Sequence, residues 1–492
     1  MNILLINPPE DNLIKNFAYE DGTQCLDSPD FGHFPPLGIL YIAAYLEKYA
    51  PEHKTYLLDC VSEKMSYETI EEKIKEIKPD LVGISSFSVA LVDIVKTADI
   101  IKKINPKTHI CMGGHHTMVF PKEAVELQNI DSIILGDGEK AFCQLAKALA
   151  AGVSIEEITG VYTKNSIFKY LNASNNKNLL LYDLDLIPAY TDNLDELPFP
   201  ARRLISHLEF FSTVGVSKKF TTIVSSRGCP YHCTFCDVPH KKYRSRSIKN
   251  IVDEIEDCIK QGYEEFHFYD DMFNITPTRI IEFSNEVLSR KLKFTWDFRG
   301  RVNTITKESL QIAKKAGLSM VSFGVETGTD EGLKYIKKET TVALIKNAFK
   351  ICNDLKIKTV ADYMLGFQFE KTKEDIKKSI DFCISIKPTY AVFSVLSLYP
   401  KTPVYYEAIE KKLIDPTRWE KFCKNPTKDF YIDYWEEFFT RKELLDMQQE
   451  AFERFFLRPR YILKSILDLR SIDELKIKIR GFFRLLASKF KK

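Results

Sequence analysis

The chain has 492 residues, and its 45% apolar and 28% charged content is the balance of ordinary globular domains. Its net charge of +2 excludes a protein built throughout to bind polyanions, so we expect no nucleic-acid partner, although residues 453–492 carry 12 Lys/Arg against 4 Asp/Glu. No apolar run reaches the ~20 residues of a membrane span, and the start MNILLINPPED lacks the parts of a signal peptide, so we predict a cytoplasmic protein.

Strands and helices alternate over residues 1–150. The predicted strands are 1–7, 54–60, 81–87, 109–114 and 132–138. The predicted helices are 37–48, 66–79, 89–104, one that starts at 121, and 139–150. This alternation predicts a parallel, doubly wound, flavodoxin-like sheet. Ligands of such sheets bind at the carboxyl ends of the strands, which here end in the loops SSFS, GGHH and GDGE.

The pattern changes after residue 150. Residues 151–215 contain the polar stretch NASNNKN and a Pro-rich stretch, which are typical of an interdomain connection. Residues 216–405 then show six strand–helix repeats, which predict a (β/α) barrel or part of one, with functional residues at the carboxyl ends of its strands. We expect residues 406–492 to be mostly helical.

Three of the eleven cysteines, Cys229, Cys233 and Cys236, lie in one short loop after the first strand of the second series. The other eight are scattered, mostly in apolar runs, and we interpret them as buried free thiols. In a reducing compartment a cysteine cluster indicates metal rather than disulfide. A structural zinc ion needs a fourth ligand, for which His232 and His240 are available. A 4Fe-4S cluster can instead be held at three irons, which leaves the fourth iron open for a small molecule.

The cysteine spacing, in this strand context, resembles the radical S-adenosylmethionine (SAM) superfamily. The resemblance implies a 4Fe-4S cluster on the three cysteines, with SAM bound at the open iron through its amino and carboxylate groups. An external electron donor such as flavodoxin or ferredoxin would reduce the cluster, and cleavage of SAM would give a 5′-deoxyadenosyl radical that abstracts hydrogen. The protein then orients the reactants and excludes water.

The same resemblance implies a SAM-binding role for residues at other strand ends. Phe235 matches the family's apolar position beside the adenine. Asp270 and Asp271, in FYDDMFN, lie where the family contacts the methionine amino group, although adjacent carboxylates also cap helices. Glu326, in FGVETGTDEG, lies near the ribose or the substrate, and Gly366, in YMLGF, lies in the stretch that packs against adenine.

Two arginines end the third strand of the second series, in the stretch DFRGRVN. Guanidinium groups pair well with carboxylates and phosphates. We therefore predict that Arg299 and Arg301 bind an anionic group of the substrate or a cofactor. The alternative is a solvated pair with no ligand.

The first domain lacks a G-x-G-x-x-G after its first strand, which disfavours a dinucleotide site. Joined to a radical SAM barrel, it resembles the cobalamin-binding domain of one large subfamily, through PPLGILYIAAYLE, LVGISSFS, MGGHHTMVFP and ILGDGEKAF; with the barrel, the likeness covers roughly residues 1–405. The resemblance implies a flat macrocycle close to the backbone of small residues. The predicted cobalamin-binding residues are Ser85, Ser86, Gly113, Gly114, His115, Gly136 and Gly138.

The loop after the first strand departs from that subfamily. Many cobalamin-binding domains carry Asp-x-His-x-x-Gly there, and its histidine ligates cobalt. This chain has NPPEDNLIKN, so we expect no histidine of this loop to be the lower ligand of cobalt. His115 and His116 are alternative ligands from another loop, but we favour contact with the corrin edge or ordinary loop packing for them.

The leading hypothesis is a cobalamin-dependent radical SAM enzyme that methylates an unactivated carbon of a small or hydrophobic, including lipid-like, substrate. The alternatives are a cyclisation or rearrangement with the same cofactors, and a zinc-stabilised binding protein. In the C-terminal tail, basic residues alternate with apolar ones at helical spacing, namely Leu475, Ile479, Phe482, Phe483, Leu486 and Phe490. This pattern predicts either an interfacial helix on an anionic membrane or a helix packed on the barrel.

Overall fold

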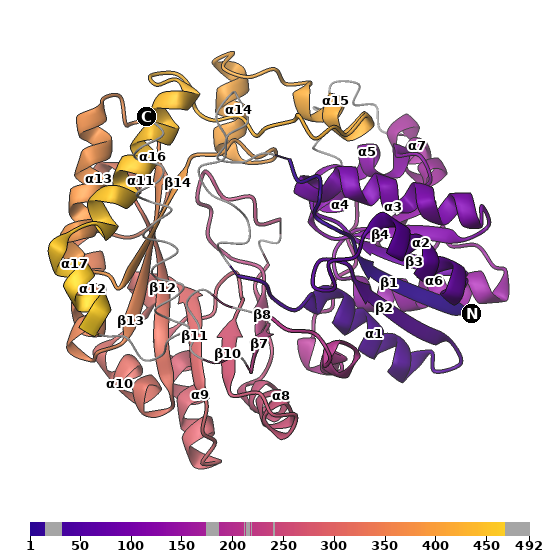
Figure 1. Cartoon of the computed structure of the whole chain (residues 1–492), viewed down its shortest axis with the longest axis horizontal. Coiled ribbons are helices and arrows are strands. Elements are labelled where there is room, and N and C mark those ends of the chain that lie inside the picture. Colours follow the sequence, from indigo (N-terminus) through magenta and orange to yellow (C-terminus); the bar gives the residue numbers. More distant parts are fainter. Residues whose placement is uncertain are drawn as a thin grey trace.

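Two six-stranded sheets, each with helices packed around it, form the two halves of the molecule (Figure 1). The computed structural model describes residues 1–14, 32–173, 186–210, 212, 217, 219–239 and 242–467. The strand orders are β2-β1-β3-β4-β5-β6 and β14-β13-β12-β11-β10-β7. The predicted fold class, a doubly wound domain followed by a partial (β/α)6 barrel and a helical region, is confirmed.

The first sheet is parallel from β1 to β5 and gains an antiparallel edge strand, β6. Its strands are β1 (Asn2–Asn7), β2 (Lys54–Asp59), β3 (Leu81–Ser85), β4 (His109–Gly113), β5 (Ser132–Ile134) and β6 (Val161–Tyr162). Its helices are α1 (Leu37–Tyr49), α2 (Tyr67–Ile77), α3 (Leu91–Ile104), α4 (His115–Val119), α5 (Pro121–Glu126), α6 (Gly138–Ala151) and α7 (Lys164–Ala173). Helices cover both faces, which is why the central strands are continuous apolar runs.

The second sheet is parallel throughout and open. Its strands are β7 (Phe220–Ile223), β10 (Glu265–Phe268), β11 (Thr295–Gly300), β12 (Leu318–Glu326), β13 (Lys358–Leu365) and β14 (Tyr390–Val395). Its helices are α8 (Ile248–Lys260), α9 (Pro277–Ser289), α10 (Lys307–Lys315), α11 (Asp330–Tyr335), α12 (Val342–Asp354) and α13 (Lys373–Ile386). Hydroxyl N-caps fix where these helices begin, since each accepts a backbone N–H of the first turn: Ser247, Thr276, Thr306, Thr329, Thr341 and Thr372.

Side chains of the second sheet alternate between two environments. On β11, Trp296 and Phe298 pack in the apolar core beneath the helices. Asp297 and Arg299 therefore lie on the opposite face, which we call the inner face. On β13, Ala361 and other core residues alternate with inner-face residues in the same way.

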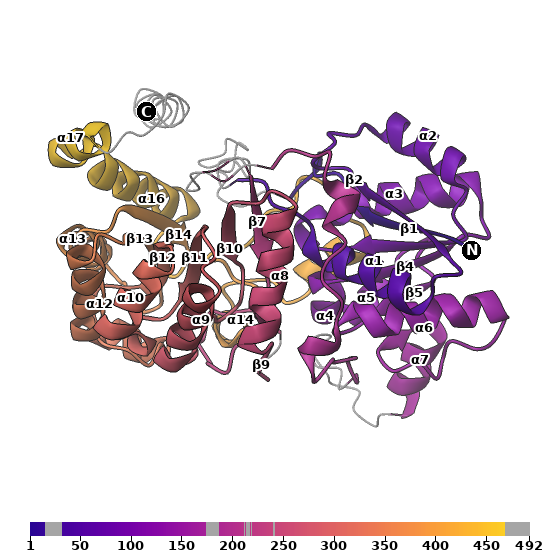
Figure 2. The same ribbon diagram turned by 90° about the horizontal axis from the view of Figure 1, so that it is seen from below.

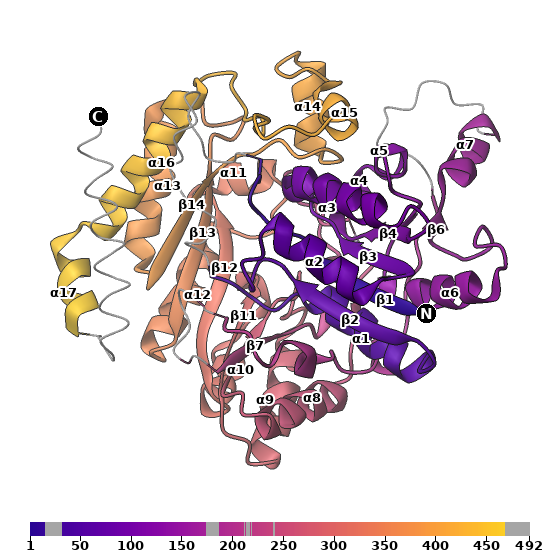
Figure 3. The same ribbon diagram turned by 45° about the vertical axis from the view of Figure 1, so that its right-hand side comes forward.

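The C-terminal helices join the two halves (Figures 2 and 3). The two that span the halves are α14 (Pro403–Glu410) and α15 (Arg418–Lys424), whereas α16 (Arg441–Phe456) and α17 (Pro459–Leu467) lie beside the second sheet. Trp419 of α15 stacks on Phe120 at 5.5 Å between ring centroids, and one apolar core runs from the first domain into this region. The predicted amphipathic residues 475–490 lie outside the described residues. Within the described part of the chain, every helix is too short or too polar to cross a bilayer.

Four elements of the first domain were not predicted. Residues 161–173, within the predicted connection 151–215, form β6 and α7 beside the first sheet, where no strand or helix was predicted. Helix α4 follows Gly114 directly, and a 3-10 turn, Ser88–Ala90, precedes α3. Elements of two to five residues contain too few positions for a period to show.

Candidate cofactor and active site

The carboxyl edge of the first sheet faces the second domain. Strand β1 starts at the outer side of the molecule and runs toward the barrel (Figures 1 and 2). Arg227 of the short strand β8 (Ser226–Arg227) pairs with Glu139 at 2.5 Å and with Asp137 at 3.0 Å. Arg244 of its partner β9 (Arg244–Ser245) also pairs with Asp137. These side chains are largely buried, so the ion pairs fix the edges of the two halves against each other.

A cavity of about 290 Å³ opens at this junction. It lies between the carboxyl ends of the first-sheet strands and the helices α1 and α6, and Val224 and Arg227 of the second domain complete its wall. The lining is mostly apolar and includes Leu5, Ile84 and Phe142. Apolar walls with a few polar groups are typical of small-molecule sites.

Glycines give this cavity its width. A Cβ at Gly83 would lie 2.8 Å from the Phe142 ring and 2.9 Å from Leu5, and one at Gly138 would lie 2.9 Å from Ile42. Gly136 has φ +90°, and a Cβ there would meet the carbonyl oxygen of Ala189 at 2.1 Å. Only glycine keeps this backbone and leaves the space beside it open.

The structure brings five of the seven predicted cobalamin-binding residues to the cavity, namely Ser85, Gly113, Gly114, Gly136 and Gly138. Ser86 is buried, and its hydroxyl donates to the carbonyl oxygen of Gly113 at 2.9 Å. Its side chain is therefore engaged in a hydrogen bond to the backbone and does not line the cavity. His115 lies instead beside the cysteine loop, with its Nε2 3.4 Å from Asp237. Burial lowers the pKa of the neighbouring His116 to about 3, and its Nδ1 lies 2.9 Å from the Ser88 hydroxyl.

The three cysteines follow β8 at the carboxyl end of the second sheet. Cys233 is buried at 8% exposure, and Cys229 and Cys236 are half-buried. Among the described residues, the one trio of candidate ligand atoms within 4.8 Å of one another does not include them. Thiolates on a single zinc ion lie closer than that, since each Zn–S bond is about 2.3 Å. At least two of the three thiols therefore lie farther apart in this structure than the ligands of one zinc ion.

Arg301 lies beside the cysteine loop. Its Nη1 is 3.8 Å from the sulfur of Cys233, and its guanidinium lies 3.7 Å from the centroid of the Tyr231 ring. Its Nη2 is buried with no hydrogen-bond partner in the described structure. A buried, unsatisfied cation next to the thiols fits an anionic group held there.

The two predicted aspartates have different environments. Asp270 is buried and accepts from the backbone N–H of Ser225 at 2.6 Å and of Ser226 at 3.2 Å. Burial raises its pKa, and these hydrogen bonds oppose the rise. Asp271 is exposed and accepts from the backbone N–H of Gly228 at 3.0 Å. Asp270 therefore holds the turn before the cysteines, and Asp271 faces solvent at the loop itself.

Two of the remaining predicted SAM residues, Glu326 and Phe235, lie beside Lys338, which sequence reasoning missed. Its Nζ is 2.6 Å from Glu326 Oε1 and 5.8 Å from the centroid of the Phe235 ring. Gly366, with φ +84°, donates its N–H to Glu370, whose pKa burial raises to about 7. Lys338 was missed because the stretch KYIKK contains three lysines, and nothing in the sequence distinguishes this one.

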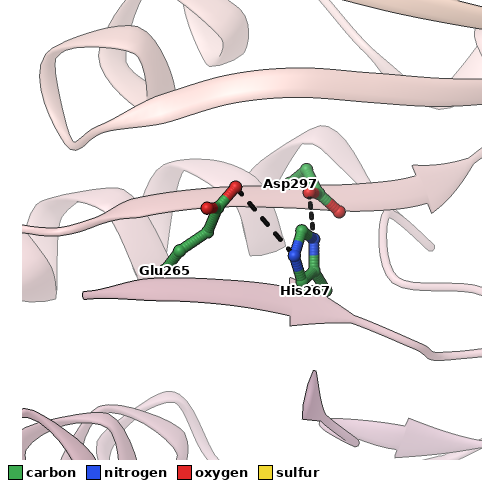
Figure 4. A group of neighbouring side chains, drawn as sticks. All are labelled: Glu265, His267 and Asp297. Carbon is green, nitrogen blue, oxygen red and sulfur yellow. Dashed lines mark hydrogen bonds and ion pairs between the residues drawn. The ribbon is translucent and has the colours of Figure 1, made fainter. Parts of the chain in front are cut away.

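A second group was also missed: Glu265, His267 and Asp297, the trio within 4.8 Å, on the inner face of β10 and β11 (Figure 4). His267 Nδ1 is hydrogen-bonded to Asp297, and its Nε2 is 3.9 Å from Glu265. Phe34 and Phe220 lie edge-on to the imidazole. Glu265 and His267 lie two residues apart on β10, and only strand pairing places Asp297, 30 positions later, beside them.

Comparisons with known proteins identify a known domain in each half of the chain. The B12 binding domain model matches residues 31–146, and the Radical SAM superfamily model matches residues 223–383. The chain is 28% identical to an uncharacterised methyltransferase of Pyrococcus horikoshii, over 99% of this chain and 98% of that protein. It is 27% identical to the anaerobic magnesium-protoporphyrin IX monomethyl ester cyclase of Rubrivivax gelatinosus, over 88% of this chain and 75% of that protein.

The fold also matches a solved structure. The cobalamin-dependent SAM radical enzyme OxsB, with aqua-cobalamin and SAM bound, aligns with a TM-score of 0.69 at 18% identity, over 98% of this chain and 71% of that one. The identification made from the cysteine spacing and the strand-end loops is confirmed. The chain therefore carries a B12 binding domain followed by a radical SAM domain, the two domains that the sequence predicted.

Proposed function

We propose that the protein is a cobalamin-dependent radical SAM methyltransferase acting on an unactivated carbon of a small or hydrophobic substrate. Its cofactors are a 4Fe-4S cluster, SAM and cobalamin. When bound, these groups supply a 5′-deoxyadenosyl radical for hydrogen abstraction and a methyl group for transfer. The similarity to the methyltransferase of Pyrococcus horikoshii along nearly the whole chain supports this reaction over others.

Cys229, Cys233 and Cys236 would hold the cluster. The unsatisfied Nη2 of Arg301 would stabilise the negative charge at the cluster or on the SAM carboxylate. Phe235 and the backbone at Gly366 would flank the adenine, and Asp271 would accept from the SAM amino group. The Glu326–Lys338 pair would orient the ribose or the substrate, since each holds the other in one position.

The glycine-lined cavity would take part of the cobalamin. At about 290 Å³ it is at the lower end of small-molecule pockets. It therefore fits a flat portion of this large cofactor, such as the base of its nucleotide tail, while the corrin would lie at the strand ends outside. Since His115 contacts Asp237 and His116 is buried, neither is our choice as the lower ligand of cobalt.

One observation carries the proposal: the carboxyl ends of both sheets meet, and His115 of the first domain contacts Asp237 of the cysteine loop. A substrate carbon between these edges could reach both cofactors. Positioning of this kind supplies most of the catalysis in such a reaction. We assign no general base, because hydrogen abstraction does not require one.

Anaerobic reconstitution with iron, sulfide and cobalamin, followed by assay for 5′-deoxyadenosine, tests the proposal. Cys233→Ala should lose the cluster iron and the product. Cys258→Ala, which changes a buried thiol of α8, should keep both. Formation of 5′-deoxyadenosine by Cys233→Ala would refute the cluster assignment, and a protein containing one zinc and no acid-labile sulfide would favour the binding-protein alternative.

Cyclisation or rearrangement with the same cofactors is the second candidate. The similarity to the magnesium-protoporphyrin ester cyclase of Rubrivivax gelatinosus favours it. Product mass separates the two reactions, because methylation adds one CH2 unit and cyclisation does not. Both need an external electron donor such as a flavodoxin or a ferredoxin.

We also infer that the C-terminal end contacts an anionic membrane surface from the cytoplasmic side. The last described helix, α17, exposes Leu463, Ile466 and Leu467 at 57–75% of their surface, and the sequence after it is basic. Exposed apolar side chains combined with basic residues favour binding to anionic lipid. Sedimentation with anionic vesicles should pull down the wild type and less of a Leu463→Ser, Ile466→Ser variant.

A further inference from the structure

Arg299 differs from every other charged residue named above on the inner face of the second sheet. Its side chain is exposed, whereas Asp297, two residues earlier on the same face, is buried. The guanidinium lies 4.7 Å from the centroid of the Tyr269 ring. Stacking on an aromatic ring orients a guanidinium but leaves its N–H donors unused.

Asp297 would be the natural partner of Arg299, but His267 occupies it (Figure 4). Burial opposes protonation of His267, yet the hydrogen bond to Asp297 and the charges of Asp297 and Glu265 raise its pKa. The imidazole therefore tends to carry a positive charge between the two carboxylates. Glu265 also accepts from the backbone N–H of Ser217 at 2.6 Å.

The next two carboxylates along the inner face are also engaged. Asp362 accepts from the Ser322 hydroxyl at 2.7 Å, and strand pairing places Ser322 directly beside Arg299. Glu326 is held by Lys338. Within the described ranges, Arg299 forms no ion pair, although four carboxylates lie on the surrounding strands.

Arg301, two residues later on the chain, is buried and hydrogen-bonded, unlike Arg299 in the described structure. Its Nε donates to Asn303 at 3.3 Å, and its Nη1 reaches the sulfur of Cys233. The sequence alone does not distinguish the two arginines. The structure commits Arg301 to the cysteine loop and leaves Arg299 facing the space in front of the sheet.

Given the proposed function, on which this step rests, we propose that Arg299 binds an anionic group of the substrate, a carboxylate or a phosphate. An exposed guanidinium without an ion pair in the described structure can match the two oxygens of either group. The acidic neighbours would repel such an anion if they were not neutralised. His267 and Lys338 offset part of that negative charge, and the Ser322 hydroxyl engages Asp362, so within the described residues the Arg299 guanidinium is left without an ion-pair partner.

Binding of inorganic phosphate and of acetate to the anaerobically reconstituted enzyme tests this, by 31P and 13C NMR linewidth titration. Phosphate alone, acetate alone or both should bind the wild type saturably, and which one binds better identifies the class. Arg299→Gln should weaken that binding by about tenfold or more, as expected for losing a charge-assisted group. Arg299→Lys should retain part of it, and Arg203→Gln, which changes an exposed arginine paired with Glu47, should change nothing.

Equilibrium dialysis with SAM separates the substrate from the cofactor. Arg299→Gln should leave the Kd for SAM unchanged, and phosphate should not displace SAM. Wild-type binding of neither anion, equal binding by Arg299→Gln, or weakened SAM binding in that variant would each overturn the assignment. Failure of the proposed function would look different, since the wild type would then form no 5′-deoxyadenosine whatever the anion binding.

Discussion

Replacement of Gly83 by alanine tests the cobalamin cavity with one methyl group. The added Cβ would lie 2.8 Å from two carbons of the Phe142 ring and 2.9 Å from Leu5 Cδ2. Ordinary carbon contacts are about 3.5–4.0 Å, so these side chains must move into the cavity. Once cobalamin fills the cavity, the side chains have to return, and overpacking of the bound state costs about 1–3 kcal/mol of binding free energy. If cobalamin has to reverse the shift, its Kd rises about 5- to 140-fold, at about 1.4 kcal/mol per tenfold.

Absorbance titration with hydroxocobalamin measures this change. Gly38→Ala is the matched control, because Gly38 lines the same cavity and a Cβ there meets nothing within 4 Å. The control should bind as the wild type does. The melting temperature of cobalamin-free Gly83→Ala should change little, since the displaced side chains enter empty volume. Wild-type affinity in Gly83→Ala would refute the assignment of this cavity to cobalamin.

Two further predictions concern stability. Arg227→Met removes a positive charge that pairs with the buried carboxylates of Glu139 and Asp137, and removal of one partner of a buried ion pair costs about 3–5 kcal/mol of the free energy of unfolding. Denaturant unfolding measures this loss. A change below about 1 kcal/mol would mean that solvent already screens the pair. Burial raises the pKa of Glu123 to about 7, so its neutral form stabilises the fold below pH 4.5 and that stability is lost as the pH rises through 7. Glu123→Gln should therefore melt higher than the wild type at pH 8 and equally at pH 4.5, and equal melting at both would contradict the raised pKa.

Much of the fold was predictable because local signals agree with each other. The helices of the second domain begin at Ser or Thr caps and carry a clear apolar period. The sequence therefore predicts helices over 247–261, 276–290, 307–316, 341–355 and 373–386, which match α8, α9, α10, α12 and α13 within one residue. The strands of both sheets are apolar runs between these helices. Helix α7 was missed because it lies next to a polar stretch, which biased the interpretation of the whole segment.

The site was predictable only in part. The spacing of Cys229, Cys233 and Cys236 is a local pattern, and so are the glycine loops of the first domain. The Arg227–Glu139 pair joins residues 88 positions apart, and no local pattern records which arginine of one domain meets which acid of the other. The different roles of Arg299 and Arg301 depend on which neighbouring carboxylates are already paired, and strand pairing alone decides that.

The buried ion pairs between the halves have a consequence for engineering. Asp137 and Glu139 come from one domain, and Arg227 and Arg244 from the other, so each half presents unmatched charges when it is separated. A barrel grafted from a relative would have to bring arginines at these two positions, or the acceptor domain would have to lose both acids at once. Chimeras that exchange the four residues as a set should stay folded, whereas a junction placed between them should give insoluble protein.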